Sequence, residues 1–153
     1  MLVCAAVLPV SADAERVQPL RFFEGRTEMV SMVRVIMQKP YRSRTIGAGR
    51  VLPDGSLALV QQIYDEGKQP EQRRWSIRPA GPRRFSGTMT EAVGPVVVDE
   101  LRGAYRFKFR MKGQLAVEQW LVPLPDGTSA RTSLTVRKYG MKVASSVGTV
   151  RRI

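Results

Sequence analysis

The segment Tyr105–Lys112, with the sequence YRFKFRMK, alternates large apolar and cationic side chains without interruption. A β-strand directs successive side chains to opposite faces, whereas an α-helix, with a period of about 3.6 residues, would mix the two sets. The segment therefore predicts a strand with one face in a core and one basic face in solvent. The set predicted to be buried is Tyr105, Phe107, Phe109 and Met111, and the set predicted to be exposed is Arg106, Lys108, Arg110 and Lys112.

Short runs of the same strand character fill the chain from residue 20 onward, separated by turns that contain glycine and proline. Pro53-Asp54-Gly55 and Pro125-Asp126-Gly127 are typical turns, because proline presets φ and glycine tolerates positive φ. About nine or ten strands at spacings of about 8–12 residues are typical of an antiparallel sandwich or barrel. This region has no convincing helical period, so the chain is predicted to be all-β.

Composition gives the size class and a preference for anionic partners. The 153 residues favour a single domain, and the hydrophobic fraction of 43% is ordinary for a globular protein. The formal net charge of +12 predicts attraction to nucleic acid, to a phospholipid or lipopolysaccharide surface, or to an acidic polymer. A basic exterior without a specific partner explains the same charge, and both interpretations stay open.

Several classes of catalytic and metal site lack the residues that they need. The chain has no histidine and a single cysteine, Cys4. Catalysis of the Ser-His-Asp and Cys-His types is therefore excluded, as are metal sites built on histidine or cysteine clusters. Two carboxylate pairs remain for acid–base chemistry, Glu91 with Asp99 and Glu100 with Glu118, although salt bridges are the commoner fate of such groups. We predict no enzymatic activity, no metal and no cofactor.

The first fourteen residues resemble a secretory signal. Residues 1–14 begin with an apolar run and end in a small-x-small pattern, which predicts cleavage after Ala14. The protein would then function in the periplasm or cell envelope, with residues 15–153 as a single β-barrel domain. The alternative is a cytoplasmic protein in which this segment is a buried first strand. No other stretch approaches the roughly 18 apolar residues of a transmembrane helix.

The basic strand face could bind nucleic acid or an anionic membrane surface. The alternation of aromatic residues and cations disfavours nucleic acid. Single-stranded nucleic acid is bound by aromatic side chains that share a face with cations. In Tyr105–Lys112 the aromatic residues are out of phase with the cations, so nucleic acid is disfavoured. The exposed set Arg106, Lys108, Arg110 and Lys112 is instead a candidate contact for an anionic membrane or lipopolysaccharide.

The inward aromatic residues allow two interpretations. A barrel of about eight strands has an interior just wide enough for side chains or for one small ligand. A hollow barrel would bind a small apolar or lipid-like ligand, in a pocket of about 300–1,000 Å³ for a drug-sized molecule. A filled barrel would be a structural or interaction protein of the envelope. The candidate lining residues are Trp75, Ile77, Phe85, Tyr105, Phe107, Phe109 and Trp120.

Short motifs in a fixed order resemble a bacterial family of exported proteins and candidate lipoproteins of unknown function. The motifs are Phe22–Thr27 (FFEGRT), Asp54–Leu59 (DGSLAL), Arg74–Ile77 (RWSI), Phe85–Gly87 (FSG) and Lys138–Val143 (KYGMKV). The first is similar to the F-F-x-G-x-T opening of that family. The resemblance implies a lipocalin-like (calycin) antiparallel barrel and an envelope location. Together with the strand pattern, this predicts a barrel or strongly bent sandwich of about 8–10 strands. It supplies no catalytic residues.

Overall fold

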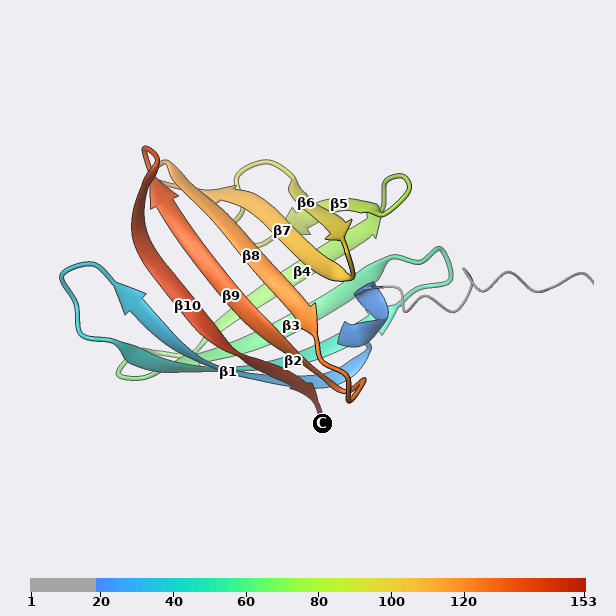
Figure 1. The fold of residues 1–153 in the computed structure, drawn as a ribbon, viewed down its shortest axis with the longest axis horizontal. Coiled ribbons are helices and arrows are strands. Elements are labelled where there is room, and N and C mark those ends of the chain that lie inside the picture. Colours follow the sequence, from blue (N-terminus) through green and yellow to red (C-terminus); the bar gives the residue numbers. More distant parts are fainter. Residues whose placement is uncertain (1–18) are drawn as a thin grey trace, which may run out of the picture.

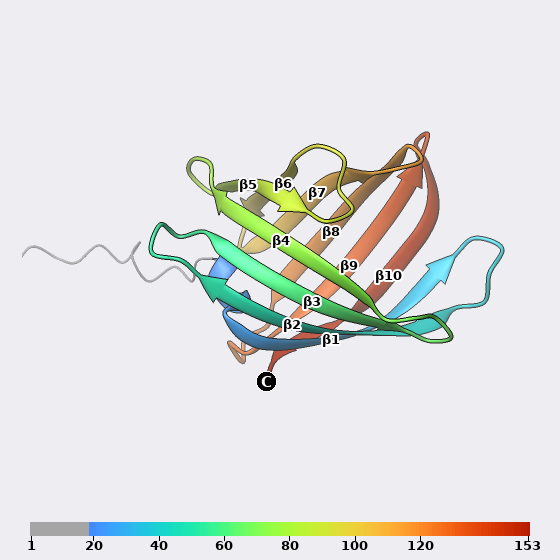
Figure 2. The same ribbon diagram turned by 180° about the vertical axis from the view of Figure 1, so that it is seen from behind.

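Ten antiparallel strands follow one another around a closed barrel in the computed structural model, which describes residues 19–153 (Figures 1 and 2). Each strand pairs with its neighbours in the sequence, and β1 pairs with β10 to close the sheet. The elements are η2 (Pro19–Phe23), β1 (Gly25–Val35), β2 (Tyr41–Val51), β3 (Leu57–Asp65), β4 (Glu71–Pro79), β5 (Arg84–Met89), β6 (Val96–Leu101), β7 (Ala104–Met111), β8 (Leu115–Pro123), β9 (Ser129–Lys138) and β10 (Met141–Arg152). The prediction of an all-β, lipocalin-like barrel is confirmed, and closure of the sheet excludes the bent sandwich.

The alternation in β7 sorts most of its side chains as predicted, although Met111, predicted to be buried, is only partly buried. Tyr105, Phe107 and Phe109 are buried, with exposures of 5%, 7% and 7%. Lys108 and Arg110 are exposed on the opposite face. The one departure among the cations is Arg106, which is only partly exposed. The burial of this strand fixes its register, because a slip by one residue would turn the cations into the core.

A short 3-10 helix, η2, covers one end of the barrel, which we call the closed end (Figure 1). Its side chains Leu20 and Phe22 are buried in the core. Gly49 on β2 makes this approach possible, because a Cβ at this position would lie only 1.9 Å from the backbone oxygen of Phe23. Glycine is therefore required here for close contact between the helix and the sheet.

The other end, which we call the mouth, carries the β1–β2, β3–β4, β5–β6, β7–β8 and β9–β10 connections (Figures 1 and 2). Inward-facing side chains toward the mouth differ in burial, because some are only partly buried, whereas Ile63, Met89 and Val96 are buried. The partly buried set includes Met29, Val33, Met111, Leu115, Leu134 and Val136. The interior is therefore partly exposed at the mouth on the side formed by β1 and by β7 to β9.

Several sequence predictions fall on residues outside 19–153. The proposed signal at residues 1–14, its cleavage after Ala14 and the lone Cys4 are among them, so export stays a prediction. Within the described residues, no helix has the length and apolar character needed to cross a membrane. In the same part of the chain, no three Asp, Glu, Cys or His side chains lie together as a metal site would require.

Candidate functional site

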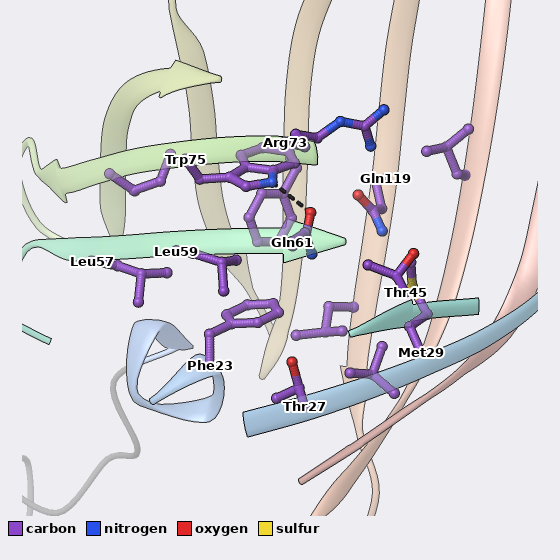
Figure 3. A pocket seen from close by; sticks show the side chains of 15 residues that line it. Phe23, Thr27, Met29, Thr45, Leu57, Leu59, Gln61, Arg73, Trp75 and Gln119 are labelled. Atoms are coloured by element: carbon purple, nitrogen blue, oxygen red, sulfur yellow. Dashed lines mark hydrogen bonds between the residues drawn. The ribbon is translucent and has the colours of Figure 1, made fainter. Parts of the chain in front are cut away.

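A small cavity lies inside the barrel, between η2 and the mouth (Figure 3). Its volume is about 70 Å³. This volume is well below the range of about 300–1,000 Å³ expected for a drug-sized ligand. The predicted pocket size is therefore wrong for the barrel as the structure has it. The apolar part of the lining includes Phe23, Leu57, Leu59, Trp75, Ile77 and Phe107.

Aromatic rings form one wall of the cavity. The Trp75 ring meets Phe107 and Phe109 edge to face, with ring centroids 6.2 and 5.7 Å apart. Phe23, which rises from η2, meets Phe107 in the same geometry at 6.3 Å. Such contacts hold the rings in fixed orientations, because the edge of one ring is attracted to the face of the next. The wall is therefore a preformed apolar surface.

One partner of an ion pair, Arg73, belongs to the lining of the cavity. Arg73 faces inward because it alternates in phase with Trp75 and Ile77 along β4. Its Nε donates to Glu91 Oε1 at 3.1 Å, and its Nη2 donates to Glu91 Oε2 at 2.8 Å. The two side chains are only 24% and 31% exposed. Glu91 belongs to the β5–β6 loop at the mouth, so the loop is fastened to the barrel wall by this bidentate contact.

Two glutamine side chains add neutral polar groups near Arg73 (Figure 3). Trp75 Nε1 donates to Gln61 Oε1 at 2.7 Å, and Gln119 Nε2 donates to Thr132 Oγ1 at 3.0 Å. The indole N–H is only a donor, which fixes the amide of Gln61 with its oxygen toward Trp75. Within residues 19–153 the amide nitrogen of Gln61 has no protein acceptor, so it is available to a ligand.

The residues predicted to line the barrel divide into three groups. Trp75, Ile77 and Phe107 line the cavity. Phe85, Tyr105 and Phe109 are buried in the core beside it without lining it. The prediction for Trp120 is wrong, because Gln119 and Leu121 take the inward positions of β8 and Trp120 points to the outer face.

On the outer face, Trp120 belongs to a charged cluster that also holds Arg106. The Arg106 guanidinium lies 5.7 Å from the Trp120 ring centroid, and the indole Nε1 donates to Glu118 Oε1 at 2.8 Å. Arg106 also pairs with Asp99 at 3.5 Å, although its buried Nε has no hydrogen-bond partner within residues 19–153. Arg106 is therefore engaged within the protein, and only Lys108, Arg110 and Lys112 of the predicted anion-contact set are exposed.

Glu91 and Asp99 do not form the predicted pair, because Glu91 pairs with Arg73 at the mouth, whereas Asp99 pairs with Arg84 on the outer face at 2.9 Å. In the second predicted pair, Glu100 lies opposite Tyr105 and Glu118 opposite Lys108, and Glu118 accepts a hydrogen bond from Trp120. The hydrogen bond from Arg84, followed by that from Arg106, lowers the pKa of Asp99 below its ordinary value. Burial, followed by the charge of Glu100, raises the pKa of Tyr105.

Sequence reasoning missed the inward polar group, of which Arg73 is the central residue. The available signal was the period of two in β4, which places Arg73 on the face of Trp75 and Ile77. Arg74, the cation quoted in the family motif, is on the exposed outer face.

The fold and the cavity define a lipocalin-like, calycin-type barrel that opens at one end. No family model matches this chain, and no curated protein matches it. Three solved structures share the fold. The S-type phycobiliprotein lyase CPES from Guillardia theta has a TM-score of 0.69 at 8% identity, over 88% of this chain and 90% of that chain. Rv2717c from M. tuberculosis has a TM-score of 0.67 at 12% identity, over 88% and 94%.

A protein of unknown function from the DUF3598 family of Nostoc punctiforme PCC 73102 has a TM-score of 0.62 at 13% identity, over 89% of this chain and 49% of that chain. At such identities the similarity shows the fold alone. The calycin-type architecture implied by the family resemblance is thus supported, while membership of the exported family and lipoprotein character stay predictions.

The prediction that this chain has no enzymatic activity is contradicted by these structures. One barrel of this fold is a phycobiliprotein lyase. The absence of histidine and of a metal motif therefore does not exclude an enzyme on this scaffold. Function has to be inferred from the site, because one fold carries many activities.

Proposed function

We propose that the barrel binds a small amphipathic carboxylate, with its apolar part against Trp75 and Phe107 and its carboxylate on Arg73. The observation that supports this most is the position of Arg73, which lines an apolar cavity and pairs with a single acid from a mouth loop. A partly buried ion pair is a poor way to stabilise a fold, because well-packed hydrophobic residues often do as well or better. A ligand site explains why a guanidinium is retained there.

Binding would exchange one carboxylate for another. The ligand would take the place of Glu91 on the bidentate edge of Arg73, and Glu91 would turn to solvent with its loop. The free amide nitrogen of Gln61, held in place by Trp75, would donate to the ligand. Charge on Arg73 stays balanced throughout, which keeps the cost of desolvation low.

The small volume of the cavity sets a further condition on binding. A chain-like ligand needs more room than about 70 Å³, so side chains toward the mouth must move. Met29 and Leu134 line the cavity and are only partly buried. Methionine adapts readily because its side chain is unbranched and flexible. These residues would therefore move aside as the ligand enters.

Tryptophan fluorescence provides the test, and Trp120→Phe makes it specific by leaving Trp75 as the only tryptophan. In this background decanoate should change the emission saturably and bind more tightly than decanol. Arg73→Met should weaken decanoate about tenfold or more and leave decanol little changed, because it removes a charge-assisted hydrogen bond. Arg74→Met, whose side chain is exposed outside the barrel, is the matched control.

Glu91→Gln should strengthen decanoate binding, because it removes the competing carboxylate. If neither compound changes Trp75 emission, the filled barrel with a structural role is the better interpretation. If decanoate binds equally well to Arg73→Met, the apolar cavity binds ligands but Arg73 does not recognise the carboxylate.

We also propose an envelope location, on the basis of the signal-like residues 1–14. N-terminal sequencing of protein from the native host should find Glu15 first. A retained Met1 on cytoplasmic protein would refute export and leave the ligand proposal unaffected.

A further inference from the structure

Two neighbouring turns at the mouth expose the most accessible large apolar side chains of the described chain. Met37 in the β1–β2 turn is 101% exposed, and Tyr139 and Met141 at the β9–β10 turn are 79% and 73% exposed. The turns belong to paired strands, and Ile36 N donates to Val143 O at 3.0 Å between them. We call residues 34–39 and 137–142 the docking tips.

The backbone of the docking tips makes these apolar residues more unusual. Met37 and Tyr139 have φ values of 62° and 49°, in the left-handed region that favours glycine and asparagine. Arg83, Arg102 and Gln114 share this conformation in other turns. Among the non-glycine residues with positive φ in residues 19–153, Met37 and Tyr139 are the ones with large apolar or aromatic side chains, and both are mostly exposed.

Cations surround the exposed apolar residues. They are Arg34, Lys39, Lys112, Arg137, Lys138 and Lys142, all exposed. None of the six makes an ion pair with an acidic side chain in residues 19–153. The acidic side chains at this end lie on other strands and turns, namely Asp65 at the end of β3, Glu66 in the β3–β4 turn, Glu71 at the start of β4, and Glu91, which pairs with Arg73. Glu66 accepts a hydrogen bond from the backbone N–H of Arg42. The positive charge is thus concentrated on the docking tips and the adjacent β7–β8 turn.

We propose that the docking tips attach the barrel to an anionic lipid bilayer, with the mouth facing the membrane. Met37, Tyr139 and Met141 would enter the headgroup region, where apolar and aromatic side chains are favourable, and the cations would contact anionic headgroups. A soluble polyanion would use the cations but has no need of exposed apolar tips, which is why a bilayer fits better. The proposal does not depend on the ligand in the cavity.

Sedimentation with vesicles of phosphatidylglycerol and phosphatidylcholine tests the apolar contribution. The triple variant Met37→Ser, Tyr139→Ser, Met141→Ser should partition onto the vesicles about tenfold or more weakly than the unmodified chain. The reason is that less apolar surface would be buried in the bilayer. The matched control is Leu52→Ser with Leu101→Ser, two exposed apolar residues in or beside closed-end turns. This control should bind vesicles like the unmodified chain.

A charge-matched comparison tests orientation without touching the apolar residues. Lys138→Glu with Lys142→Glu should abolish vesicle binding, whereas Arg83→Glu with Arg102→Glu, at closed-end turns, changes net charge equally and should have little effect. Binding should also fall with salt and require phosphatidylglycerol. Equal losses in both charge pairs would show non-specific attraction and overturn the proposal.

Single-stranded DNA separates a bilayer from a general polyanion. The serine variant of the docking tips should bind DNA as the unmodified chain does, because its cations are intact. If the serine variant still binds vesicles like the unmodified chain, the proposal is overturned. It is also overturned if the serine variant loses vesicle binding and DNA binding to the same extent.

Discussion

The closed end and the mouth are built from the same ten strands, yet they differ in burial and in polarity. At the closed end Leu20, Ile77 and Leu121 are only 1%, 1% and 2% exposed. Toward the mouth, inward residues such as Leu115 stay partly exposed, and Arg73 lies among the apolar side chains. The comparison indicates that η2 seals the closed end, whereas the mouth combines buried apolar residues such as Met89 and Val96 with partly exposed and polar ones.

The largest expected difference between the ends comes from two leucines of the same strand. Leu121→Ala at the closed end should reduce the free energy of unfolding by about 3 kcal/mol, because a fully buried leucine leaves a cavity that the core cannot fill. Leu115→Ala, at the mouth end of β8, should cost about 1 kcal/mol, because its side chain is already partly hydrated. Urea denaturation of both variants measures the difference. Equal losses would mean that stability is spread evenly along the barrel.

Gly49→Ala tests the contact that closes the barrel. The new methyl group would collide with the backbone oxygen of Phe23, so η2 must move away from β2. The expected cost is about 2 kcal/mol, within the usual range for overpacking. Hydrogen exchange should accelerate in η2 more than in the mouth strands.

Ala48→Ser provides the control, because Ala48 is the exposed neighbour on the same strand and should change stability by less than about 0.5 kcal/mol. If η2 stays protected in Gly49→Ala, the helix is not what seals this end.

The fold was predictable because β7 alternates without exception and because turn residues separate the other strands. Local pattern failed in β8, where LAVEQWLVP does not alternate, so the outward phase of Trp120 follows only from pairing with β7 and β9. The ion pair of Arg73 and Glu91 joins residues on two sides of a hairpin, and it depends on the register that sets Trp75 opposite Met89. Cavity volume is equally non-local, because it depends on how all inward side chains pack together.

The smallest expected effect lies on the outer face of the closed half, where Asp99 joins Arg84 and Arg106. Asp99→Asn should cost less than about 1 kcal/mol near neutral pH, because its main partner, Arg84, is 59% exposed and solvent screens its charge. The folded-state pKa of Asp99 is depressed, chiefly by the hydrogen bond from Arg84. Its contribution is therefore complete above the ordinary carboxyl pKa of 3.8 and is lost as pH falls through the lower folded-state value.

The gap in unfolding free energy between the unmodified chain and Asp99→Asn should thus be constant above about pH 5 and shrink as pH falls below 3.8, because the carboxylate is protonated first in the unfolded state and then in the folded state. Urea titrations over this range measure the gap. The double variant Arg84→Gln, Asp99→Asn shows whether Arg84 is the partner, because removing Asp99 should cost less when Arg84 is already absent. A gap that widened on acidification would mean that Asp99 destabilises the fold when ionised, and the assigned ion pair would then be wrong.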